Sequence, residues 1–373
     1  MEVLKHTIED WKKLTHTLGQ SFAARAFTYD ADNTFVHENY KELRAHDYFS
    51  LLVPEALGGA GMSYAEVCDI IRIIGQYCGS TALAFSMHQH LVAATVWKFK
   101  NKGEGAPLLK KVADQQIVLV STGARDWLGS NGEMTKVDGG YLVNAKKHFA
   151  SQSAGGDIAV TSAPYLNEGG EWKVLHFAVP FSADGVNVLD DWDVMSMRGT
   201  GSQTIEFNDV FVADESIALE RPKDVFHPVY NLVLTVAMPL IMSAYVGIAE
   251  RAQEIAVNIG RKYARNQKHF PYILGKMNNE LMSAQCQLKC MVERTNNFDF
   301  DLDDHLTGQI VTLKTNVVEA CLSTVRQAME GIGGQSIYRK NELERLFRDM
   351  QAAQFHPMPK WDQYAFTGQL LLN

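Results

Sequence analysis

The sequence predicts an α+β protein in which two helical regions enclose a central β region. Apolar residues recur with helical spacing up to about residue 115 and again from about Pro222, while short alternating runs of apolar and polar residues fill the middle. We therefore expect three domains: an α domain over 1–115, a β domain over 116–218 and a C-terminal helical domain over 219–373. With 373 residues, 46% of them hydrophobic and 21% charged, the chain can bury a large core.

The N-terminal region contains the clearest helix start in the chain. Ser63 and Glu66 have the spacing of a capping box directly before the apolar run VCDIIRIIGQYC, so we expect a helix with Ser63 as its N-cap. Just upstream, Pro54 and three glycines punctuate the run LLVPEALGGAG. The backbone must turn tightly there or be approached closely.

The central region changes in texture near Gln116. Its runs are IVLVSTG, GYLVNAKKHFA, IAVTSAPY, KVLHFAVPF and QTIEFNDVFV, and the turn sequences DGG, NEGG and SADG lie between them. Period-two alternation bounded by Gly, Asp and Asn is typical of strands joined by tight turns. We therefore expect antiparallel β structure in this region.

The segment 229–249 carries no charged side chain and is about long enough to span a membrane. It contains Asn231, Thr235, Pro239 and Ser243, and it continues into the charged stretch ERAQEIAVNIGRKYARNQ. This composition favours a long core helix that is buried all round, and Pro239 should kink it or lie in its first turns. No membrane association is predicted. A helix apolar on every face must be covered, so we expect self-association through this helix and its neighbours, to a homodimer or homotetramer.

Charge and cysteine content restrict the class of protein. The formal net charge of −8 argues against sequence-independent binding of nucleic acid, because such binding requires clustered Lys and Arg. The five cysteines lack C-x-x-C spacing and lie in segments with helical patterning, so we expect buried free thiols in a reducing compartment. The N-terminal stretch MEVLKHTIEDWKKL has no apolar core of a secretory signal. We therefore expect a cytoplasmic protein.

The pair His88 and His90 in SMHQHL has the residue type of a metal site. Residues i and i+2 on a helix face apart, however, so the two rings would not meet on one ion. No metal site is predicted.

Four blocks of the sequence carry a resemblance to a known family. One block, MSMRGTGSQTIEFNDVFV from Met195 to Val212, pairs a turn rich in Gly, Ser and Thr with an apolar strand that closes on an Asn-Asp corner. The others are LLVPEALGGAG at 51–61, KKHFASQS at 146–153 and LERLFRDMQAAQFHP at 343–357. In order and spacing they resemble the acyl-CoA dehydrogenase superfamily of flavoproteins. The resemblance implies an N-terminal all-α domain, a middle antiparallel β-barrel or sandwich and a C-terminal four-helix bundle, with the flavin between the last two.

A flavin ring needs hydrogen-bond partners along its O2, N3 and N5 edges and a flat partner on one face. By resemblance, Ser121 and Thr122 at the end of IVLVST contact the pyrimidine edge and N5. Phe149 falls where the family has a ring-stacking Trp, and Ser151 falls where it has a Thr near N5. Both exchanges are conservative, since an aromatic face and a hydroxyl group are kept.

The resemblance places a second set of cofactor contacts in the C-terminal half. The run RNQKHF corresponds to a helix-end motif that reaches across a dimer interface to the FAD pyrophosphate, and the usual Arg is replaced by Gln267 while Phe270 is kept. The run EGIGGQS corresponds to a glycine element around the adenine half and keeps Gly333 and Gly334, with Glu330 at its start. Loss of a cation and gain of an acid weaken an anion site. FAD is therefore the family expectation, and FMN is the alternative.

The loop GARDWLGSN departs from the family. It has two extra residues before Gly129 and Ser130, and Asn131 stands where Asp is usual. In the family's dehydrogenases this loop contacts the pantetheine and phosphates of acyl-CoA, so Ser130 is a candidate for substrate binding. Trp127 is a second candidate, and together with Arg125 it would shape a pocket for a different substrate.

The general base of the dehydrogenase reaction is missing. That reaction removes a proton α to a thioester while hydride leaves from the β carbon, so a carboxylate must lie within hydrogen-bond reach of the α carbon. In most of the family a Glu follows shortly after the Arg-Asp pair; counted from Arg348 and Asp349, its position holds His356 and Pro357, and no Glu follows. The family's second location, on the long helix, falls on Ala237.

His356 in this register resembles the flavin monooxygenase branch of the superfamily, such as dibenzothiophene monooxygenase, where a His stands near the reacting edge of the flavin. A His can donate to an oxygen atom or accept a proton near neutral pH, but it also suits a helix end before a proline. Two reactions stay open. Dehydrogenation of an acyl-CoA-type thioester, with electron-transfer flavoprotein as partner, is the expectation that the family implies, and O2-dependent monooxygenation with a flavin reductase is the alternative. Both predict a flavin-dependent oxidoreductase acting on a small molecule, with His356 as the catalytic candidate.

Overall fold

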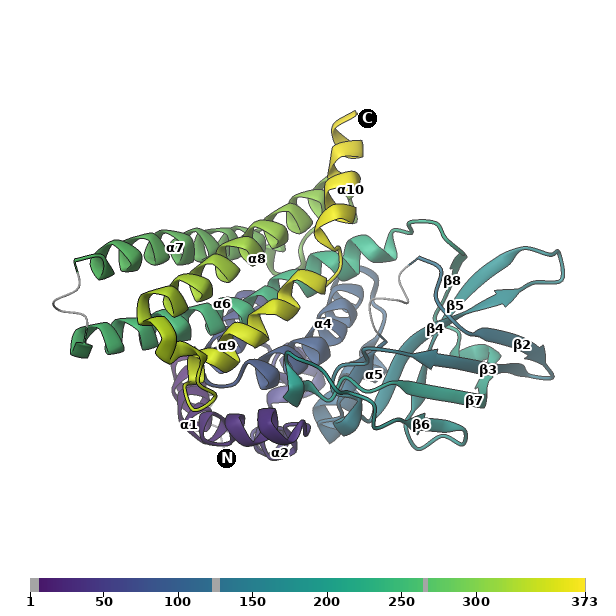
Figure 1. The fold of residues 1–373 in the computed structure, drawn as a ribbon. Coiled ribbons are helices and arrows are strands. Elements are labelled where there is room, and N and C mark those ends of the chain that lie inside the picture. Colours follow the sequence, from purple (N-terminus) through teal and green to yellow (C-terminus); the bar gives the residue numbers. More distant parts are fainter. Residues whose placement is uncertain (1–6, 123–127, 264–267, 373) are drawn as a thin grey trace.

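A computed structural model of the chain describes residues 7–122, 128–263 and 268–372. Helices, a β-sheet and further helices follow one another along the chain (Figure 1). The long helices α6, α7 and α8 lie side by side, and the sheet stands at the end of the molecule where α6 begins (Figure 1). The predicted α+β fold, with helical regions on either side of a β region, is confirmed.

The N-terminal region is helical, as predicted. Its helices are α1 (Ile8–Asp32), α2 (His37–Ala45), α3 (Tyr64–Tyr77), α4 (Gly79–Lys102) and α5 (Ala106–Gln115). The capping box forms at the start of α3, where the Ser63 hydroxyl accepts the Glu66 N–H at 3.3 Å and the Glu66 carboxylate accepts the Ser63 N–H at 2.7 Å. Helix α3 packs directly on α6, because a Cβ atom on Gly247 would lie only 2.2 Å from the carbonyl oxygen of Arg72.

The central region forms one mixed sheet. Its strands are β1 (Leu119–Ser121), β2 (Glu133–Val137), β3 (Gly140–Lys147), β4 (Ile158–Leu166), β5 (Trp172–Pro180), β6 (Val186–Val188), β7 (Ile205–Ala213) and β8 (Leu219–Pro222). The strands run in the order β6-β7-β3-β2-β4-β5-β8, with β1 beside β4. Strand β8 pairs with β5, so the sheet continues past residue 218.

The expected antiparallel pairing needs one correction. Strand β1 pairs with β4 in parallel, through Leu119 and Ile158, and β2 meets β4 in parallel at Met134 and Tyr165. The other pairings among the described residues are antiparallel. The reason is topological. In the sequence the β2–β3 hairpin comes between β1 and β4, and a connection of this length allows the chain to re-enter the sheet in the same direction.

The C-terminal region consists of α6 (Val229–Tyr263), α7 (Phe270–Arg294), α8 (Asp304–Ile332), α9 (Glu342–Gln351) and α10 (Lys360–Leu372). In the most apolar stretch of α6, 94% of the residues are buried within the single chain, which confirms a core helix. Two of its polar side chains are paired: Asn231 donates to Asp304 at 2.8 Å, and Ser243 donates to the Pro239 carbonyl at 2.8 Å. Pro239 lies inside the helix, which continues on both sides.

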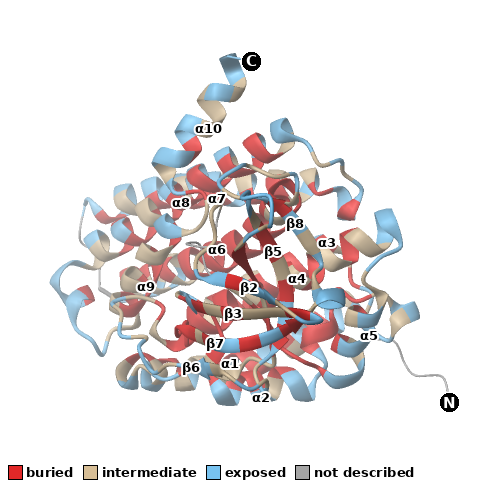
Figure 2. Cartoon of the chain, turned by 90° about the vertical axis from the view of Figure 1, so that its right-hand side faces the viewer, coloured by how far each residue is buried: buried red, intermediate tan, exposed pale blue. Residues whose placement is uncertain are grey.

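The burial of α6 corrects the expectation that this helix mediates self-association. The central part of the molecule is buried where α6 runs, whereas exposed residues lie on the outer helices (Figure 2). One chain therefore covers α6 by itself, and a second copy would have to use other surfaces.

The cysteines agree with the expected burial in three of five cases. Cys68, Cys78 and Cys321 are buried free thiols, whereas Cys286 is exposed and Cys290 is partly buried. Both exceptions lie on α7, which packs on α6 and α8 with one face and leaves the other face to solvent.

Candidate functional site

Ser121 and Thr122 lie at the carboxyl end of β1, where the chain leaves the sheet. The Thr122 N–H donates to the Val160 carbonyl at 3.4 Å, and the Thr122 hydroxyl lies 3.0 Å from the hydroxyl of Thr161. Both residues are partly buried. The parallel β1–β4 pairing therefore fixes these two hydroxyl groups at one edge of the sheet.

Phe149 lies just after β3. Its ring contacts Trp192 on one side and is about half exposed to solvent. Its backbone has a φ of 57°, a left-handed conformation that is uncommon for an aromatic residue. The ring is 52% exposed and meets Trp192 edge to face, with 5.9 Å between the ring centroids. A fixed aromatic ring with an open face is suited to stack against a flat ligand.

Ser151 follows two residues later and is 8% exposed. Its oxygen accepts a hydrogen bond from the Ser202 hydroxyl at 3.0 Å, and within the described residues the hydrogen of Ser151 has no acceptor, so it can bond to a ligand. The next residue, Gln152, donates from Nε2 to the Leu119 carbonyl in β1 at 2.9 Å. This bond ties the segment that carries Phe149 and Ser151 to the strand that carries Ser121, so the structure brings these expected flavin contacts to one region.

The turn within the Gly/Ser/Thr-rich block joins this region to helix α9. The Met197 N–H donates to Asp349 Oδ1 at 2.7 Å, and the Ser196 hydroxyl donates to the Asp349 carbonyl at 3.2 Å. The Trp192 indole, which holds Phe149, donates to the Met197 carbonyl at 3.3 Å. Asp349 is only 1% exposed, and this burial raises the pKa of its carboxyl to about 6. Asp349 is therefore a structural link between the sheet and the C-terminal helices.

His356 follows the short helix η9 (Ala352–Phe355), just beyond α9. Its Nε2 atom lies 2.7 Å from the phenol oxygen of Tyr245 on α6. Tyr245 is fully buried, and this burial raises the pKa of its phenol well above the usual value, so the phenol stays protonated. Among the described residues the phenol has His356 as its hydrogen-bond partner, and an O–H group without an acceptor would be costly there. Tyr245 therefore donates to Nε2, and the ring proton of His356 must sit on Nδ1.

The His356 ring is neutral at ordinary pH. Burial, and to a smaller extent the nearby Lys314 ammonium, together lower the pKa of the imidazole to about 3. Within the described part of the chain Nδ1 has no hydrogen-bond partner. This nitrogen atom is also not fully enclosed by protein, so a ligand can reach it. His356 thus offers a neutral N–H donor rather than an acid or a strong base.

Neither the family's second base position, Ala237, nor the acids Glu344 and Asp349 on α9 supply a general base. Ala237 is 3% exposed within the apolar core of the helices. On α9, Glu344 accepts from Arg348 at 2.6 Å, and Asp349 accepts the Met197 N–H. His356 is therefore the titratable group that the structure offers at the family's base position.

Ser130 has structural partners within the β region. Its hydroxyl donates to the Ser162 carbonyl at 2.8 Å and lies 3.0 Å from the Ser162 hydroxyl, while the buried Lys147 ammonium donates to it at 3.2 Å. The Ser130 hydroxyl therefore forms hydrogen bonds within the β region and is not left open to a ligand. The other substrate candidate, Trp127, lies outside the described residues together with Arg125.

The second set of cofactor candidates lies far from the first. Phe270 begins α7 and is 5% exposed, and a Cβ atom on Gly331 would lie 3.1 Å from its ring. Helix α8 ends at Gly333, whose φ is 74°, and Gly334 follows directly. These helix ends lie at the end of the molecule opposite the sheet (Figure 1). Gln267 lies outside the described residues. Within one chain the structure therefore does not bring the two sets of candidates together.

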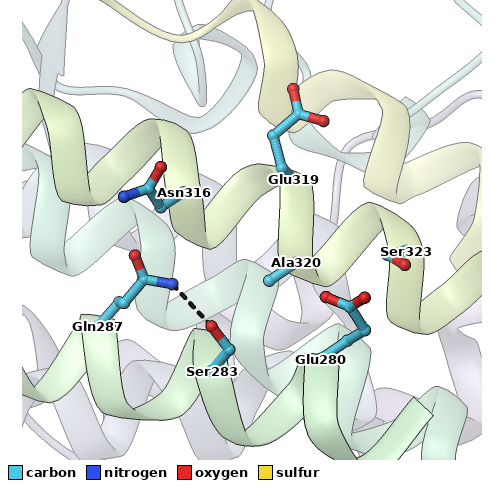
Figure 3. Close-up of a pocket in the computed structure, with 7 residues that line it drawn as sticks. All are labelled: Glu280, Ser283, Gln287, Asn316, Glu319, Ala320 and Ser323. Carbon is cyan, nitrogen blue, oxygen red and sulfur yellow. Dashed lines mark hydrogen bonds between the residues drawn. The ribbon is translucent and has the colours of Figure 1, made fainter. Parts of the chain in front are cut away.

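A hollow of about 570 Å³ lies between α7 and α8, and none of these candidates lines it. Its lining side chains come from the two helices and are mostly polar (Figure 3): Glu280, Ser283, Gln287, Asn316, Glu319, Ala320 and Ser323. Two of them are acidic, and none is aromatic or cationic. This lining suits neither a flavin ring nor a phosphate, so we do not place the site there.

The two histidines of SMHQHL are buried core residues. His88 accepts the Leu119 N–H at Nδ1 over 3.0 Å and donates from Nε2 to the Phe49 carbonyl over 2.8 Å. Burial lowers the pKa of both imidazoles to about 4, so both rings are neutral. His88 therefore links α4 to β1.

Sequence reasoning missed Tyr245, Lys314 and the structural role of Asp349. Tyr245 is hidden in the apolar stretch of α6, where an aromatic residue is expected in any core. Lys314 carried a usable signal: it stands three residues after Val311 and four before Val318, and both valines are buried, so it lies on the buried stripe of α8. A lysine at such a position is unusual enough to identify a candidate.

The fold thus places Phe149, Ser151 and Thr122 at one edge of the sheet, and His356 beyond α9. Two family profiles match the chain: the N-terminal domain of acyl-CoA dehydrogenases over residues 12–116, and the C-terminal domain of acyl-CoA dehydrogenases over residues 240–361. The chain belongs to the acyl-CoA dehydrogenase superfamily of flavin-dependent oxidoreductases.

Relatives with both kinds of activity resemble the chain over most of its length. A putative acyl-CoA dehydrogenase, YdbM of Bacillus subtilis, is 25% identical over 93% of this chain and 92% of that protein. Dibenzothiophene monooxygenase of Mycolicibacterium goodii is 26% identical over 90% of this chain and 87% of that protein. The FMN-bound crystal structure of TdsC from Paenibacillus sp. A11-2, a dibenzothiophene monooxygenase, shares the fold with a TM-score of 0.86, at 19% identity and 97% coverage of both chains.

Proposed function

We propose that this protein is a monooxygenase that uses O2 and reduced flavin, supplied by a separate flavin reductase, to oxidise a small organic molecule. The observation that carries the proposal is the state of His356. The position where a dehydrogenase needs a carboxylate holds a neutral imidazole, and Tyr245 holds its ring with Nδ1–H as the donor. The neighbouring acids of α9 are engaged in structural bonds.

The residues at the sheet edge fit a flavin ring. Phe149 has a half-exposed ring that meets Trp192 edge to face. Ser151 has a hydroxyl hydrogen available for an acceptor, as N5 of an oxidised flavin would be. Thr122 places a further hydroxyl at the end of the neighbouring strand. Together these groups supply a flat contact and edge hydrogen bonds, which are what a protein contributes to a flavin.

A bound reduced flavin supplies two electrons, so that one atom of O2 can enter the substrate while the other leaves as water. His356 contributes a neutral hydrogen-bond donor, which stabilises a partially charged oxygen atom without protonating it. The Tyr245 phenol keeps the donor hydrogen on Nδ1. A protonated imidazole would instead release its proton readily, and burial of the ring opposes that form.

We further propose FMN as the flavin, held between two copies of the chain. The cation usual in the pyrophosphate motif is replaced by Gln267, and the acid Glu330 begins the adenine element, so the anion site of FAD is weakened. Phe270 and Gly333 lie far from the sheet edge within one chain, so any contact from this region to the phosphate of FMN would have to come from a second copy. The FMN-bound monooxygenase of the same fold agrees with this assignment.

Anaerobic titration separates the proposed reaction from dehydrogenation. The purified protein with bound oxidised flavin is mixed with a panel of acyl-CoA thioesters in the absence of O2. We expect no bleaching of the flavin absorption band, because among the described residues neither of the family's two base positions carries a carboxylate to remove the α proton. Bleaching by any thioester would select the dehydrogenase and overturn the proposal.

The role of His356 is tested with reduced protein and O2. His356→Ala should retain flavin but release hydrogen peroxide faster, because the lost hydrogen bond from Nδ1 to a partially charged oxygen atom is worth about 1–3 kcal/mol, or roughly 5- to 140-fold in rate. His305→Ala is the matched control, since His305 is exposed near the start of α8. Equal peroxide release by wild type and both variants would show that His356 is only a helix-end residue.

A further inference from the structure

Lys314 on α8 is a buried cation directly behind the backbone of His356. Its side chain is 1% exposed. The ammonium donates to the carbonyl oxygen of His356 at 3.0 Å and to the carbonyl oxygen of Met358 at 3.1 Å. These two carbonyls lie on either side of Pro357, so one side chain holds both ends of this short connection.

The position of Lys314 is set by the pattern of α8. Val311 and Val318 lie on the same stripe of the helix and are 0% and 3% exposed, so the stem of Lys314 is enclosed among apolar groups. Both hydrogen bonds of the ammonium described here end on backbone carbonyls rather than on a carboxylate. Burial accordingly lowers the pKa of Lys314 to about 8.

A buried ammonium that lacks a carboxylate partner reduces stability. An apolar side chain of similar length, such as methionine, would fill the same space without this cost. The presence of lysine is explained if its two hydrogen bonds and its charge serve the segment that they contact.

We propose that Lys314 is a positioning residue that clamps residues 356–358 to α8 and thereby fixes the His356 ring against Tyr245. The inference rests on the proposed role of His356 in the flavin reaction. Two contacts from different helices define the ring: Tyr245 of α6 bonds Nε2, and Lys314 of α8 holds the carbonyl of the same residue. The connection between η9 and α10 is thus held by α6 through the His356 ring and by α8 through the backbone.

The charge of Lys314 has a second consequence. A cation close to the imidazole disfavours a second positive charge on the ring, so Lys314 supports the neutral donor form of His356. Position and protonation state of the ring therefore depend on the same lysine.

The test uses full-length protein labelled with 15N in histidine, because 15N shifts report both the protonation and the tautomer of each ring. The His356 signals are assigned by their loss in His356→Gln. In wild type we expect a neutral ring with Nδ1–H between pH 8 and pH 5. In Lys314→Met the titration midpoint should shift upward from its wild-type value, and the Nε2–H tautomer should appear. Lys360→Met is the control, since Lys360 is exposed and pairs with Glu319 on the surface at 2.8 Å.

Lys314→Gln serves if Lys314→Met does not fold. The amide keeps a donor without a charge, so we expect the midpoint to shift upward while the Nδ1–H tautomer is retained. His356 signals identical to those of wild type in folded Lys314→Met or Lys314→Gln would overturn the inference.

These spectra need neither flavin nor substrate, so they separate the inference from the proposed function. Failure of the monooxygenase assay with altered His356 spectra would leave Lys314 as a positioning residue of a different reaction. Faster peroxide release in Lys314→Met than in Lys360→Met, together with the spectral change, would support both.

Discussion

Tyr245→Phe is the sharpest test of how the site is built, because it removes a single oxygen atom from the centre of the site. In the native protein that oxygen lies 2.7 Å from His356 Nε2 and belongs to a fully buried side chain. The phenylalanine ring fills the same volume, so packing is retained. The change therefore isolates one hydrogen bond.

The magnitude follows from the cost of leaving Nε2 without a donor. A buried acceptor that loses its partner costs about 1–3 kcal/mol, so the bond from Tyr245 favours the Nδ1–H tautomer by roughly 5- to 140-fold. Without the phenol the two tautomers of His356 become comparable in population. About half of the molecules then lose the Nδ1 donor, and peroxide release from reduced protein should rise about twofold, less than in His356→Ala.

The assay combines the 15N tautomer ratio of His356 with stopped-flow measurement of peroxide release. Tyr48→Phe is the matched control, because Tyr48 is also fully buried and its hydroxyl lies 2.7 Å from that of Thr15, in another part of the molecule. The control should lose similar stability without changing either readout. A tautomer ratio in Tyr245→Phe equal to that of the control would refute the assignment of the donor.

Further predictions concern the flavin edge, the buried acid and the assembly. Thr122→Val combined with Ser151→Ala should weaken flavin retention or shift the flavin potential, measured by ultrafiltration and redox titration; unchanged values would contradict the assignment of that edge. Burial raises the pKa of the Asp349 carboxyl from 3.8 in the unfolded chain to about 6 in the folded protein, so between these pH values the folded protein binds a proton that the unfolded chain has released. The stabilisation that this proton provides is therefore fully present below about pH 4 and is lost as the pH rises to 6. Relative to Asp349→Asn, wild type should lose roughly 3 kcal/mol of unfolding free energy over that range in urea titrations, and a constant difference would contradict the shift. The protein should sediment as a dimer or tetramer, and a monomer at micromolar concentration would contradict a shared site.

The sequence alone determined the architecture and the main anomaly of the chemistry. The capping box at Ser63, the strand runs with their turns and the uncharged stretch of α6 are local patterns, and local patterns depend on periodicity and on residue type within one or two turns. The missing base was visible in the same way, because His356 follows the Arg-Asp pair at a short and countable distance.

The tertiary structure decided the contacts that give His356 its chemical form. Tyr245 and Lys314 lie 111 and 42 positions before it in the chain, and nothing local indicates that α6 and α8 meet at its ring and its carbonyl. The parallel pairing of β1 with β4 likewise depends on how far the chain travels before it returns. Such pairings are set by the packing of whole helices and strands. The same packing buries the imidazole and so keeps it neutral, and it separates the two sets of cofactor candidates.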